Sequence, residues 1–531
     1  LNFSEYDREE LERADAKLSP TARETMYQQK FHLYRNLTKP SERLYLSFAK
    51  AGASGEAQNP SYLINEMRKL FPEIPVRDIE KEEKPEEKLE MPRSGEALFL
   101  EELGRAAEGE IDPLFEELYR WYAAHPEAGI PAETYRKAAF LRCADGVIGK
   151  SAASALYGDT LKNSATRLEK YAVCAFAHFM EFGLQIRERD QYELKAADMG
   201  TVMHEALEKF SKKLQENGET WKTVTDDTRD RLIEECVEET MADYGNTIFQ
   251  SSSRNQYRII RVKRILKRTV WALQQQIRQG EFEPGEFEVS FSMEDSLSAI
   301  NIDLSEHEKM RLRGRIDRVD LCETDDKVYV KIIDYKTGNT SLDLVALYYG
   351  LQLQLVLYLE AAMAMAAKRN PNRKLIPAGI FYYNVKDPML QKEMEEDLDE
   401  LDPEIFKKLK MNGLVMDDRD VIENLDRTTI SLPLSYTTKG TLRKGSSVAS
   451  ETEFELLDAY VKKKITDIRE SILNGNAEAA PYEMGNRNAC TYCPYQGTCG
   501  FDRKIPGYEF RRLKQFADEE IWKAFAKEVE D

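Results

Sequence analysis

The feature that most constrains this chain is a pair of apolar segments joined by a short polar turn. Residues 312–321 and 328–334 are rich in Val, Ile and Leu, and the residues at 323–326 read Glu-Thr-Asp-Asp. Strand-forming runs around a polar turn predict an antiparallel hairpin. Because side chains alternate along a strand, such a hairpin assigns each of its residues to one of two faces.

Three charged side chains fall on one face of this hairpin. If the turn closes symmetrically, Asp317 pairs with Ile332, so that Asp317 and Asp334 become diagonal neighbours about 7–8 Å apart. Lys336 shares the face of Asp334 because the two are separated by one residue. Two carboxylates can hold Mg²⁺ through oxygen ligands, and a lysine beside them can orient the attacking water or neutralise phosphate charge. The hairpin therefore predicts a metal-dependent nuclease centre; the alternative is a surface hairpin with ordinary charges.

Three further residues are candidates for the same centre. His204 lies beside an apolar helical stripe, where a lone histidine is usually a packed residue, but it could also bind a metal or orient water. Gln354 and Tyr358 lie four residues apart in a helix expected over 344–367 and therefore share one face. The glutamine could hold the lysine or a phosphate, and the tyrosine could contact a nucleic-acid backbone. Ordinary surface or packing roles are the alternative for both.

Four of the seven cysteines indicate a metal site in a reducing compartment. Cys490, Cys493 and Cys499 lie in a turn-rich stretch, and the Cys-x2-Cys spacing brings two thiolates onto one loop. A fourth thiolate from Cys174 would join the two ends of one domain across more than 300 residues. Such a site would act as a staple. Four thiolates suit zinc or an iron–sulfur cluster; zinc with a local histidine is the other possibility, but no histidine lies nearby.

A basic stripe free of acids is the best candidate for phosphate contacts. Its members are Arg254, Arg258, Arg261, Lys263, Arg264, Lys267 and Arg268. The alternative is a solvated helix face that pairs with acids elsewhere. The net charge of −19 excludes a broadly basic surface but is compatible with a local basic patch.

The 531 residues are long enough for two to four domains. We divide them into a mixed segment at 1–75, a helical connecting region with a charged linker at 76–160, and an α/β unit at 161–531, in which strands and helices alternate. No apolar run approaches the roughly 20 residues of a membrane span. The N-terminus lacks the features of a signal peptide, so we expect a cytoplasmic protein. The missing initiator Met suggests a fragment of a longer chain.

With these residues in place, the chain from about residue 163 onward resembles the nuclease domain of the AddB/RexB family. These are B-type subunits of bacterial ATP-dependent helicase–nuclease complexes, in the RecB-like group of the PD-(D/E)xK superfamily. The matching motifs are Gly-x3-His from Gly200 to His204, Gly-x-Ile-Asp from Gly314 to Asp317, Asp-Tyr-Lys from Asp334 to Lys336, and Gln-x3-Tyr from Gln354 to Tyr358. A weaker resemblance links residues 37–46 to the end of a superfamily 1 helicase-like domain.

The resemblance implies an α/β, restriction-endonuclease-like core with many added helices, preceded by the end of a helicase-like domain. The implied Mg²⁺ site comprises His204, Asp317, Asp334 and Tyr335. The implied catalytic set comprises Asp317, Asp334, Lys336, His204, Gln354 and Tyr358. The implied 4Fe–4S ligands are Cys174, Cys490, Cys493 and Cys499.

The function implied is that of a Mg²⁺-dependent DNA exonuclease component that processes double-strand break ends for recombinational repair in the bacterial cytoplasm. Its expected partners are DNA and an AddA-type helicase–nuclease subunit. Two alternatives remain. One is a DNA-binding or scaffolding subunit with a vestigial nuclease site, against which the intact Asp, Asp and Lys set argues. The other is a stand-alone CRISPR-type RecB-like nuclease stapled by zinc, and such nucleases are far shorter.

Overall fold

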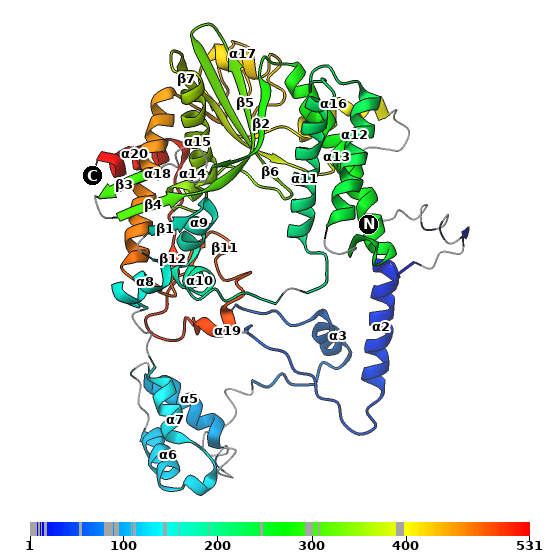
Figure 1. The fold of residues 1–531 in the computed structure, drawn as a ribbon. Helices are drawn as coiled ribbons and strands as arrows, with labels where there is room; N and C mark the ends of the chain where they lie inside the picture. Colours follow the sequence, from blue (N-terminus) through cyan, green and yellow to red (C-terminus); the bar gives the residue numbers. More distant parts are fainter. Residues whose placement is uncertain are drawn as a thin grey trace. The chain divides into compact units, whose positions relative to one another are not determined.

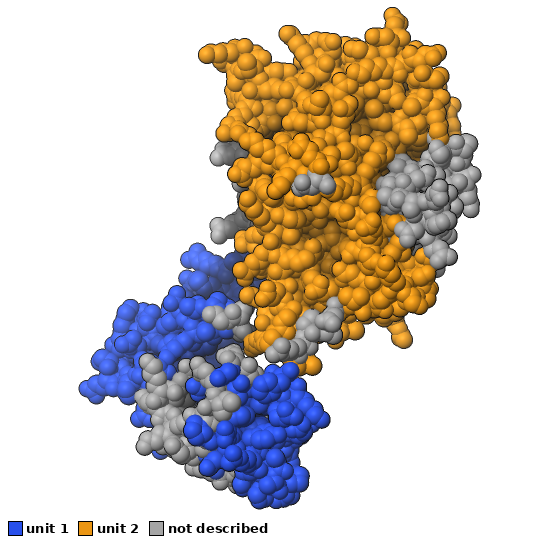
Figure 2. Space-filling view, turned by 90° about the vertical axis from the view of Figure 1, so that its left-hand side faces the viewer, with its two compact units in different colours: residues 1–140 blue, residues 141–531 orange. Residues whose placement is uncertain are grey.

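The structure is a computed structural model. It describes residues 18–52, 56–78, 95–107, 113–141, 146–158, 160–189, 191–244, 248–291, 301–305, 308–388 and 398–530, with a few isolated positions besides. The chain splits into two compact units, residues 1–140 and residues 141–531 (Figure 2). The charged linker expected within 76–160, at residues 79–88, lies outside the described residues. The division into three functional domains stays a prediction.

The first unit contains a small helical core. The helices of the unit are α2 (Ala22–Thr38), α3 (Tyr62–Leu70), α5 (Gly95–Ala107), α6 (Pro113–Ala124) and α7 (Ala132–Ala139), with a 3-10 turn at Pro126–Ala128. Phe99 and Tyr122 lie at the centre of the core formed by α5, α6 and α7, with ring centroids 5.2 Å apart. Helix α2 begins where Thr21 and Glu24 form a capping box, which satisfies backbone N–H groups of its first turn.

Residues 43–48 (Arg-Leu-Tyr-Leu-Ser-Phe) have the composition of a strand but do not form one. The backbone is irregular there, and Tyr45 is 82% exposed. A strand needs a neighbour that satisfies its N–H and C=O groups. In the described part of this unit, the only β pairing is the isolated bridge between Ala51 and Ala57. The strand propensity of residues 43–48 is therefore not realised in this chain.

The second unit is built on a six-stranded mixed sheet. In spatial order its strands are β2 (Glu283–Phe291), β5 (Gly314–Glu323), β6 (Lys327–Lys336), β7 (Lys374–Asn384), β8 (Asn412–Met416) and β9 (Val448–Ala449). Strands β6 and β7 run parallel, whereas β5 is antiparallel to both of its neighbours. Strand β6 is buried along nearly its whole length, as a central strand between two helical layers must be. The predicted α/β core is confirmed.

Helices cover both faces of this sheet (Figure 1). Helices α15 (Gln354–Arg369) and α18 (Glu451–Leu473) lie on one side, and the bundle of α11 (Ala196–Glu216), α12 (Asp226–Asp243) and α13 (Ser253–Arg278) lies on the other. One continuous apolar core joins the sheet to both layers. The many added helices of the predicted fold are therefore part of the same packed unit.

The remaining elements of this unit are short or peripheral. The helices are α8 (Lys150–Tyr157), α9 (Ala165–Val173), α10 (Ala175–His178), a π-helix at Phe179–Gly183, a 3-10 helix at Ile248–Gln250, α14 (Leu344–Tyr348), α16 (Leu398–Lys408), α17 (Arg419–Leu425), α19 (Gln496–Cys499) and α20 (Asp518–Glu530). The strands are β1 (Thr160–Asn163), β3 (Asn301–Ser305), β4 (Glu308–Leu312), β10 (Tyr482–Met484), β11 (Arg487–Asn488) and β12 (Arg511–Arg512). Across the described residues, no helix combines the length and the apolarity that crossing a bilayer requires.

The register of β5 and β6 differs from the expected one. The hairpin tip is the two-residue turn 325–326 rather than a four-residue turn, and Val319 pairs with Ile332. Continued toward the strand ends, this ladder places Asp317 opposite Asp334 instead of opposite Ile332. A shift of two residues keeps every side chain on its face. The predicted convergence of the two acids therefore holds, and they are direct rather than diagonal neighbours.

A buried ion network fixes this register on the opposite face of the hairpin. Asp320 pairs with Lys331 across the ladder, and their side chains meet at 2.7 Å. Arg318 binds the same carboxylate through two hydrogen bonds of 2.6 and 2.8 Å, and its guanidinium lies 5.2 Å from the ring centroid of Trp221. All three charged side chains are buried. A different register would leave these buried charges without their partners, which is costly, so the network favours the observed pairing.

The helix expected over 344–367 is two helices. Helix α14 ends at Tyr348, and α15 begins at Gln354. Between them Gly350 has φ +78°, a left-handed conformation that glycine adopts without strain. A side chain at this position would also lie 3.2 Å from the Cβ of Ala172 in α9. The break therefore lets α9 approach the start of α15 closely.

Replacing Asp320 with Asn should destabilise the second unit by about 3–5 kcal/mol, because it leaves two buried cations without their carboxylate. Trp221 reports the change directly, since Arg318 packs over its ring. Urea unfolding followed by tryptophan fluorescence measures the loss. The control is Asp325→Asn at the exposed hairpin tip, which should shift stability by less than about 0.5 kcal/mol. Equal midpoints for the two variants would contradict a structural role for the network.

Candidate active site

The two hairpin acids meet at one end of the sheet. Asp317 on β5 and Asp334 on β6 are both buried, with 8% and 2% of their surface exposed. The Asp317 carboxylate accepts a hydrogen bond of 2.7 Å from the backbone N–H of Tyr335, which ties it to β6. Asp334 meets Lys336 in an ion pair of 2.6 Å. The structure thus brings together the two acids and the lysine that the sequence placed on one face.

Gln354 connects this cluster to helix α15. Its amide N–H donates to Asp334 at 2.8 Å and to the Tyr358 hydroxyl at 3.0 Å, and its carbonyl accepts from Lys336 at 2.9 Å. The ammonium group of Lys336 also lies 5.4 Å from the ring centroid of Tyr382. Gln354 therefore fixes the positions of both functional groups of the Asp-x-Lys motif. Tyr358 holds Gln354 in turn.

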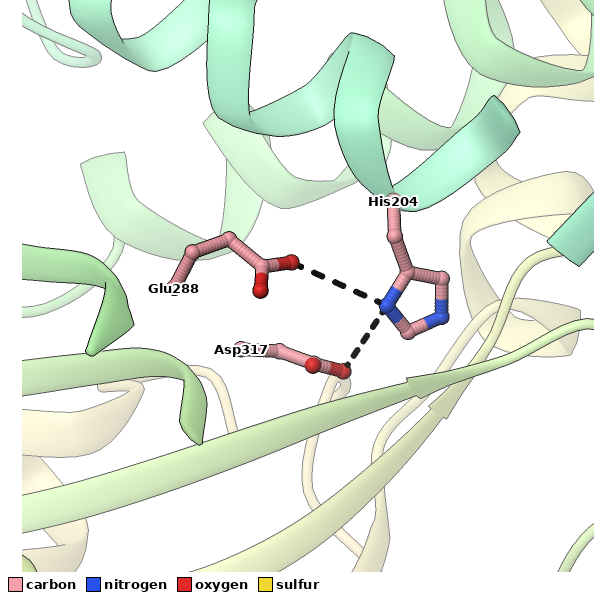
Figure 3. A group of neighbouring side chains, drawn as sticks. All are labelled: His204, Glu288 and Asp317. Atoms are coloured by element: carbon pink, nitrogen blue, oxygen red, sulfur yellow. Dashed lines mark ion pairs between the residues drawn. The ribbon is translucent and has the colours of Figure 1, made fainter. Parts of the chain in front are cut away.

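His204 enters from helix α11 (Figure 3). Its Nδ1 lies 3.2 Å from Asp317 and 3.9 Å from Glu288 on β2. One ligand atom from each of these three residues lies within 4.8 Å of the other two, an arrangement that can hold a metal ion. The histidine therefore lies beside Asp317 and Glu288, and not in the apolar core.

Sequence reasoning missed Glu288. Phe287 pairs with Arg318 and Val289 with Ile316, so Glu288 falls opposite Asp317. Its φ of +49° is a left-handed conformation that a residue other than glycine rarely adopts, and such strain occurs at functional sites. Its signal was an acid between two apolar residues, Phe287 and Val289, in β2, and only the pairing of β2 with β5 shows that it faces the centre.

The pKa values of these groups reflect three acids that crowd one buried place. Burial and then the charge of Asp317 raise the pKa of Asp334 to about 6, although Lys336 opposes this. Burial and Asp317 likewise raise the pKa of Glu288 to about 7, against the nearby Arg315. For His204, burial disfavours the imidazolium, but Asp317, Asp334 and Glu288 outweigh it and raise the pKa. Negative charge is in excess here, which is the condition that favours a bound cation.

Two motif glycines differ in what they contribute. A Cβ on Gly314 would lie 2.6 Å from the ring of Phe291 and 3.0 Å from that of Tyr358, so only glycine lets these rings pack beside Asp317. A Cβ on Gly200 would make an ordinary contact of 3.5 Å with Thr337. The glycine of Gly-x-Ile-Asp therefore shapes the site, whereas that of Gly-x3-His has room for a side chain.

Tyr335 contributes its backbone rather than its phenol. Its N–H binds Asp317, whereas its side chain is buried on the opposite face, where the hydroxyl accepts from Arg318 at 3.4 Å. A metal-binding role for this residue, as predicted, would have to use its main chain.

The four candidate cluster cysteines lie in one region of the second unit. Cys174 is buried beside Tyr495, and Cys493 packs against the same small apolar cluster. Burial raises the pKa of Cys490 to about 11, and the neighbouring thiols of Cys174, Cys493 and Cys499 contribute to the same rise. The four thiols are therefore within electrostatic range of one another, although more than 300 residues separate the first from the rest.

Most of the basic stripe on α13 is engaged by acids. Ion pairs join Lys263 to Glu238, Lys267 to Glu234, Arg264 to Asp387 and Arg268 to Asp402. Arg258 donates to the carbonyl of Leu194 at 3.2 Å. Arg254 and Arg261 are exposed, and neither has an ion-pair partner among the described residues. The stripe therefore offers two arginines, rather than seven cations, that are free of such contacts.

The raised pKa of Asp334 predicts that protons and a divalent cation compete for this site. Affinity for Mg²⁺, measured by calorimetry, should weaken as the pH falls from 8 through about 6. In metal-free protein the folded state holds the Asp334 proton more tightly than the unfolded state does. This contribution to the free energy of unfolding is complete below the unfolded pKa and is lost as the pH rises through about 6. Asp334→Asn should therefore raise the urea midpoint of metal-free protein at pH 7.5. A lower urea midpoint for Asp334→Asn than for wild type at pH 7.5 would contradict an excess of negative charge at this site.

Comparison with known proteins agrees with this geometry. Residues 162–500 match the model of the PD-(D/E)XK nuclease superfamily. The chain is 41% identical over 545 residues to a protein of Lachnoclostridium phytofermentans that is named as the B-type subunit of an ATP-dependent helicase/deoxyribonuclease, with 99% of the chain and 46% of that protein covered. Proteins of the same name from Alkaliphilus oremlandii and Clostridium acetobutylicum are each 33% identical over 99% and 100% of the chain, and it covers 46% and 47% of them. The chain thus spans about half the length of these relatives.

Proposed function

The chain belongs to the PD-(D/E)XK nuclease superfamily, and from this premise we propose that it is the nuclease-bearing part of a B-type subunit of a bacterial helicase–deoxyribonuclease complex. The observation that carries the proposal is the buried cluster of Asp317, Asp334 and Glu288 with His204 and Lys336 at one end of the sheet. The reaction is Mg²⁺-dependent hydrolysis of DNA phosphodiesters.

The donor set fits Mg²⁺, which prefers carboxylate oxygens. Asp317 and Asp334 would hold the ion, with His204 and Glu288 beside them. When bound, such an ion neutralises phosphate charge and makes water more acidic. Lys336, which pairs with Asp334, would orient the attacking water and neutralise charge on the phosphate. Hydrogen bonds from Gln354 fix the side chains of Lys336 and Asp334 relative to each other, and the backbone N–H of Tyr335 binds the Asp317 carboxylate.

The activity proposed for the whole protein is exonucleolytic processing of double-strand break ends for recombinational repair in the bacterial cytoplasm. The names of the relatives support a nuclease subunit of a complex with at least one further subunit. We assign that partner as an AddA-type helicase–nuclease subunit, as the sequence resemblance implies. Because the chain spans about half the length of these relatives, we assign it the cutting step. The helicase-like resemblance of residues 37–46 is part of the same proposal.

We assign a structural 4Fe–4S cluster to Cys174, Cys490, Cys493 and Cys499. The thiols of Cys174, Cys493 and Cys499 each raise the pKa of Cys490, which supports a shared site. Tetrahedral zinc with Zn–S bonds of about 2.3 Å would hold its sulfurs about 3.8 Å apart. Four thiolates also suit an iron–sulfur cluster, and the resemblance to the AddB/RexB nuclease domain favours the cluster over zinc.

We assign the first DNA contacts on α13 to Arg254 and Arg261. Both are exposed, and neither has an ion-pair partner among the described residues. Arg264, one turn beyond Arg261, pairs with Asp387 just after the end of β7. This end of β7 lies beside Lys336, because Lys336 pairs with Asn384. The free arginines therefore extend along α13 away from the active-site end of the sheet.

Asp334→Ala should lower Mg²⁺-dependent cleavage of linear duplex and single-stranded DNA by more than about a hundredfold, because a direct ligand matters at least as much as the groups that orient one. Cleavage of end-labelled DNA measures the loss. Asp325→Ala at the exposed hairpin tip is the control and should cut at the wild-type rate. Full activity of the Asp334 variant would sink the assignment.

Cys493→Ser should lower iron and acid-labile sulfide in the purified protein and reduce the thermal midpoint of the second unit, because the staple that joins its two ends is lost. Cys322→Ala, at a buried cysteine on β5 away from the other four, should leave the metal content unchanged. Zinc in place of iron, or unchanged melting of the Cys493 variant, would contradict the cluster staple.

Replacing Arg254 and Arg261 together with Gln should reduce the slope of log K against log salt for DNA binding by about 1.4 for single strands, or about 1.8 for duplex. The matched control is Lys263→Gln with Lys267→Gln, which removes two cations that already pair with acids. That control should leave the slope nearly unchanged. The same slope change in both double variants would reject this assignment.

A further inference from the structure

Glu169 on α9 caps a helix that lies 184 residues away in the chain. One oxygen of its carboxylate accepts hydrogen bonds from the backbone N–H groups of Leu353 at 2.7 Å and Gln354 at 3.0 Å. These are the first groups of α15, whose own N-cap residue Leu353 provides no side-chain cap. The first N–H groups of a helix need an outside acceptor, and negative charge is favourable there.

The capped residue is the one that organises the nuclease centre. Gln354 carries the side chain that binds Asp334, Lys336 and Tyr358. It is also the first residue of α15, directly after the break around Gly350, so no preceding helical turn holds it. The Glu169 carboxylate supplies the contact that this break removes.

The other end of α9 lies at the cysteine-rich region. Cys174 is the residue at which α9 ends, about 7–8 Å along the axis from Glu169 at 1.5 Å per residue. Arg511, which follows the last three cysteines, donates to the carbonyl of Ala172 at 2.5 Å and to that of Val173 at 3.2 Å. It also donates to the carbonyl of Ala480 at 2.7 Å.

We propose that Glu169 is a positioning residue for the nuclease centre, and that α9 is the rigid element through which the cysteine-rich staple supports Gln354. One end of α9 is fixed by Cys174 and Arg511. Five residues earlier, its carboxylate fixes the backbone that presents Gln354 to Asp334 and Lys336. The expected effect on DNA cleavage rests on the proposed nuclease function. The expected effect on the start of α15 rests on the capping geometry alone.

The kinetic test compares two substitutions at one position. Glu169→Gln keeps a carbonyl oxygen that accepts both N–H groups, whereas Glu169→Ala removes it. We expect the alanine variant to lower kcat by about 10–100-fold, the range for residues that orient a metal site. KM for DNA should not change, since the carboxylate is bound to backbone N–H groups rather than to a cation that meets phosphate. The glutamine variant should recover most of kcat. Iron content should equal that of wild type in both.

The control is Glu360→Ala. It removes a carboxylate from a half-buried position on α15, where Glu360 pairs with Lys462 at 2.8 Å. It should cleave DNA at the wild-type rate. A glutamine variant as inactive as the alanine variant would overturn positioning in favour of a chemical role for the carboxylate. Wild-type kcat in the alanine variant would overturn the proposal outright.

A second readout does not depend on cleavage. Hydrogen exchange at the amides of Leu353 and Gln354 should become faster by about tenfold or more in Glu169→Ala and stay at the wild-type rate in Glu360→Ala. Arg511→Met, which loosens the other end of α9 without removing a cysteine, should accelerate the same amides by a smaller factor. Unchanged exchange in both Glu169→Ala and Arg511→Met overturns the proposal, even for a protein that cuts no DNA. A wild-type protein that fails to cut would contradict only the proposed function.

Discussion

The buried ion pair between Asp320 and Lys331 decides where the nuclease centre forms. These residues face each other across the β5–β6 ladder, and Arg318 completes their network inside the protein. A slip of one residue would move the acids of the centre to the opposite face, and a slip of two would make Asp317 and Asp334 diagonal rather than direct neighbours. A network buried on one face of the hairpin therefore fixes the geometry of the reactive face.

The centre carries an excess of buried carboxylates, and a bound cation would neutralise part of this charge. Asp334 and Glu288 have raised pKa values because burial and Asp317 disfavour their ionised forms. A buried site that carries more carboxylates than cations and is rich in oxygen donors favours a bound divalent ion. The hydrogen bonds of Gln354 to Asp334 and Lys336 hold these two side chains in position before any ion binds.

Sequence reasoning succeeded where one strand or one helix carries the information. Alternation along the hairpin placed Asp317, Asp334 and Lys336 on one face, and this parity survived a two-residue error in register. The error arose because the turn has two residues rather than four, and four consecutive polar residues do not reveal which two form the tip. Glu288 escaped notice because its position depends on which strand pairs with β5. The break at Gly350 depends on the approach of α9.

The sequence by itself determined the α/β class, the hairpin and the face that bears its acids, and it predicted some of the residues proposed to hold a metal or a cluster. These follow from periodicity and side-chain chemistry, which are local properties. Only the tertiary structure decided that most cations of the basic stripe on α13 form ion pairs with acids, that Glu288 joins the centre, and that Glu169 caps the helix that carries Gln354. Each of these contacts joins segments distant in the chain, and no local pattern in a single sequence records such a meeting.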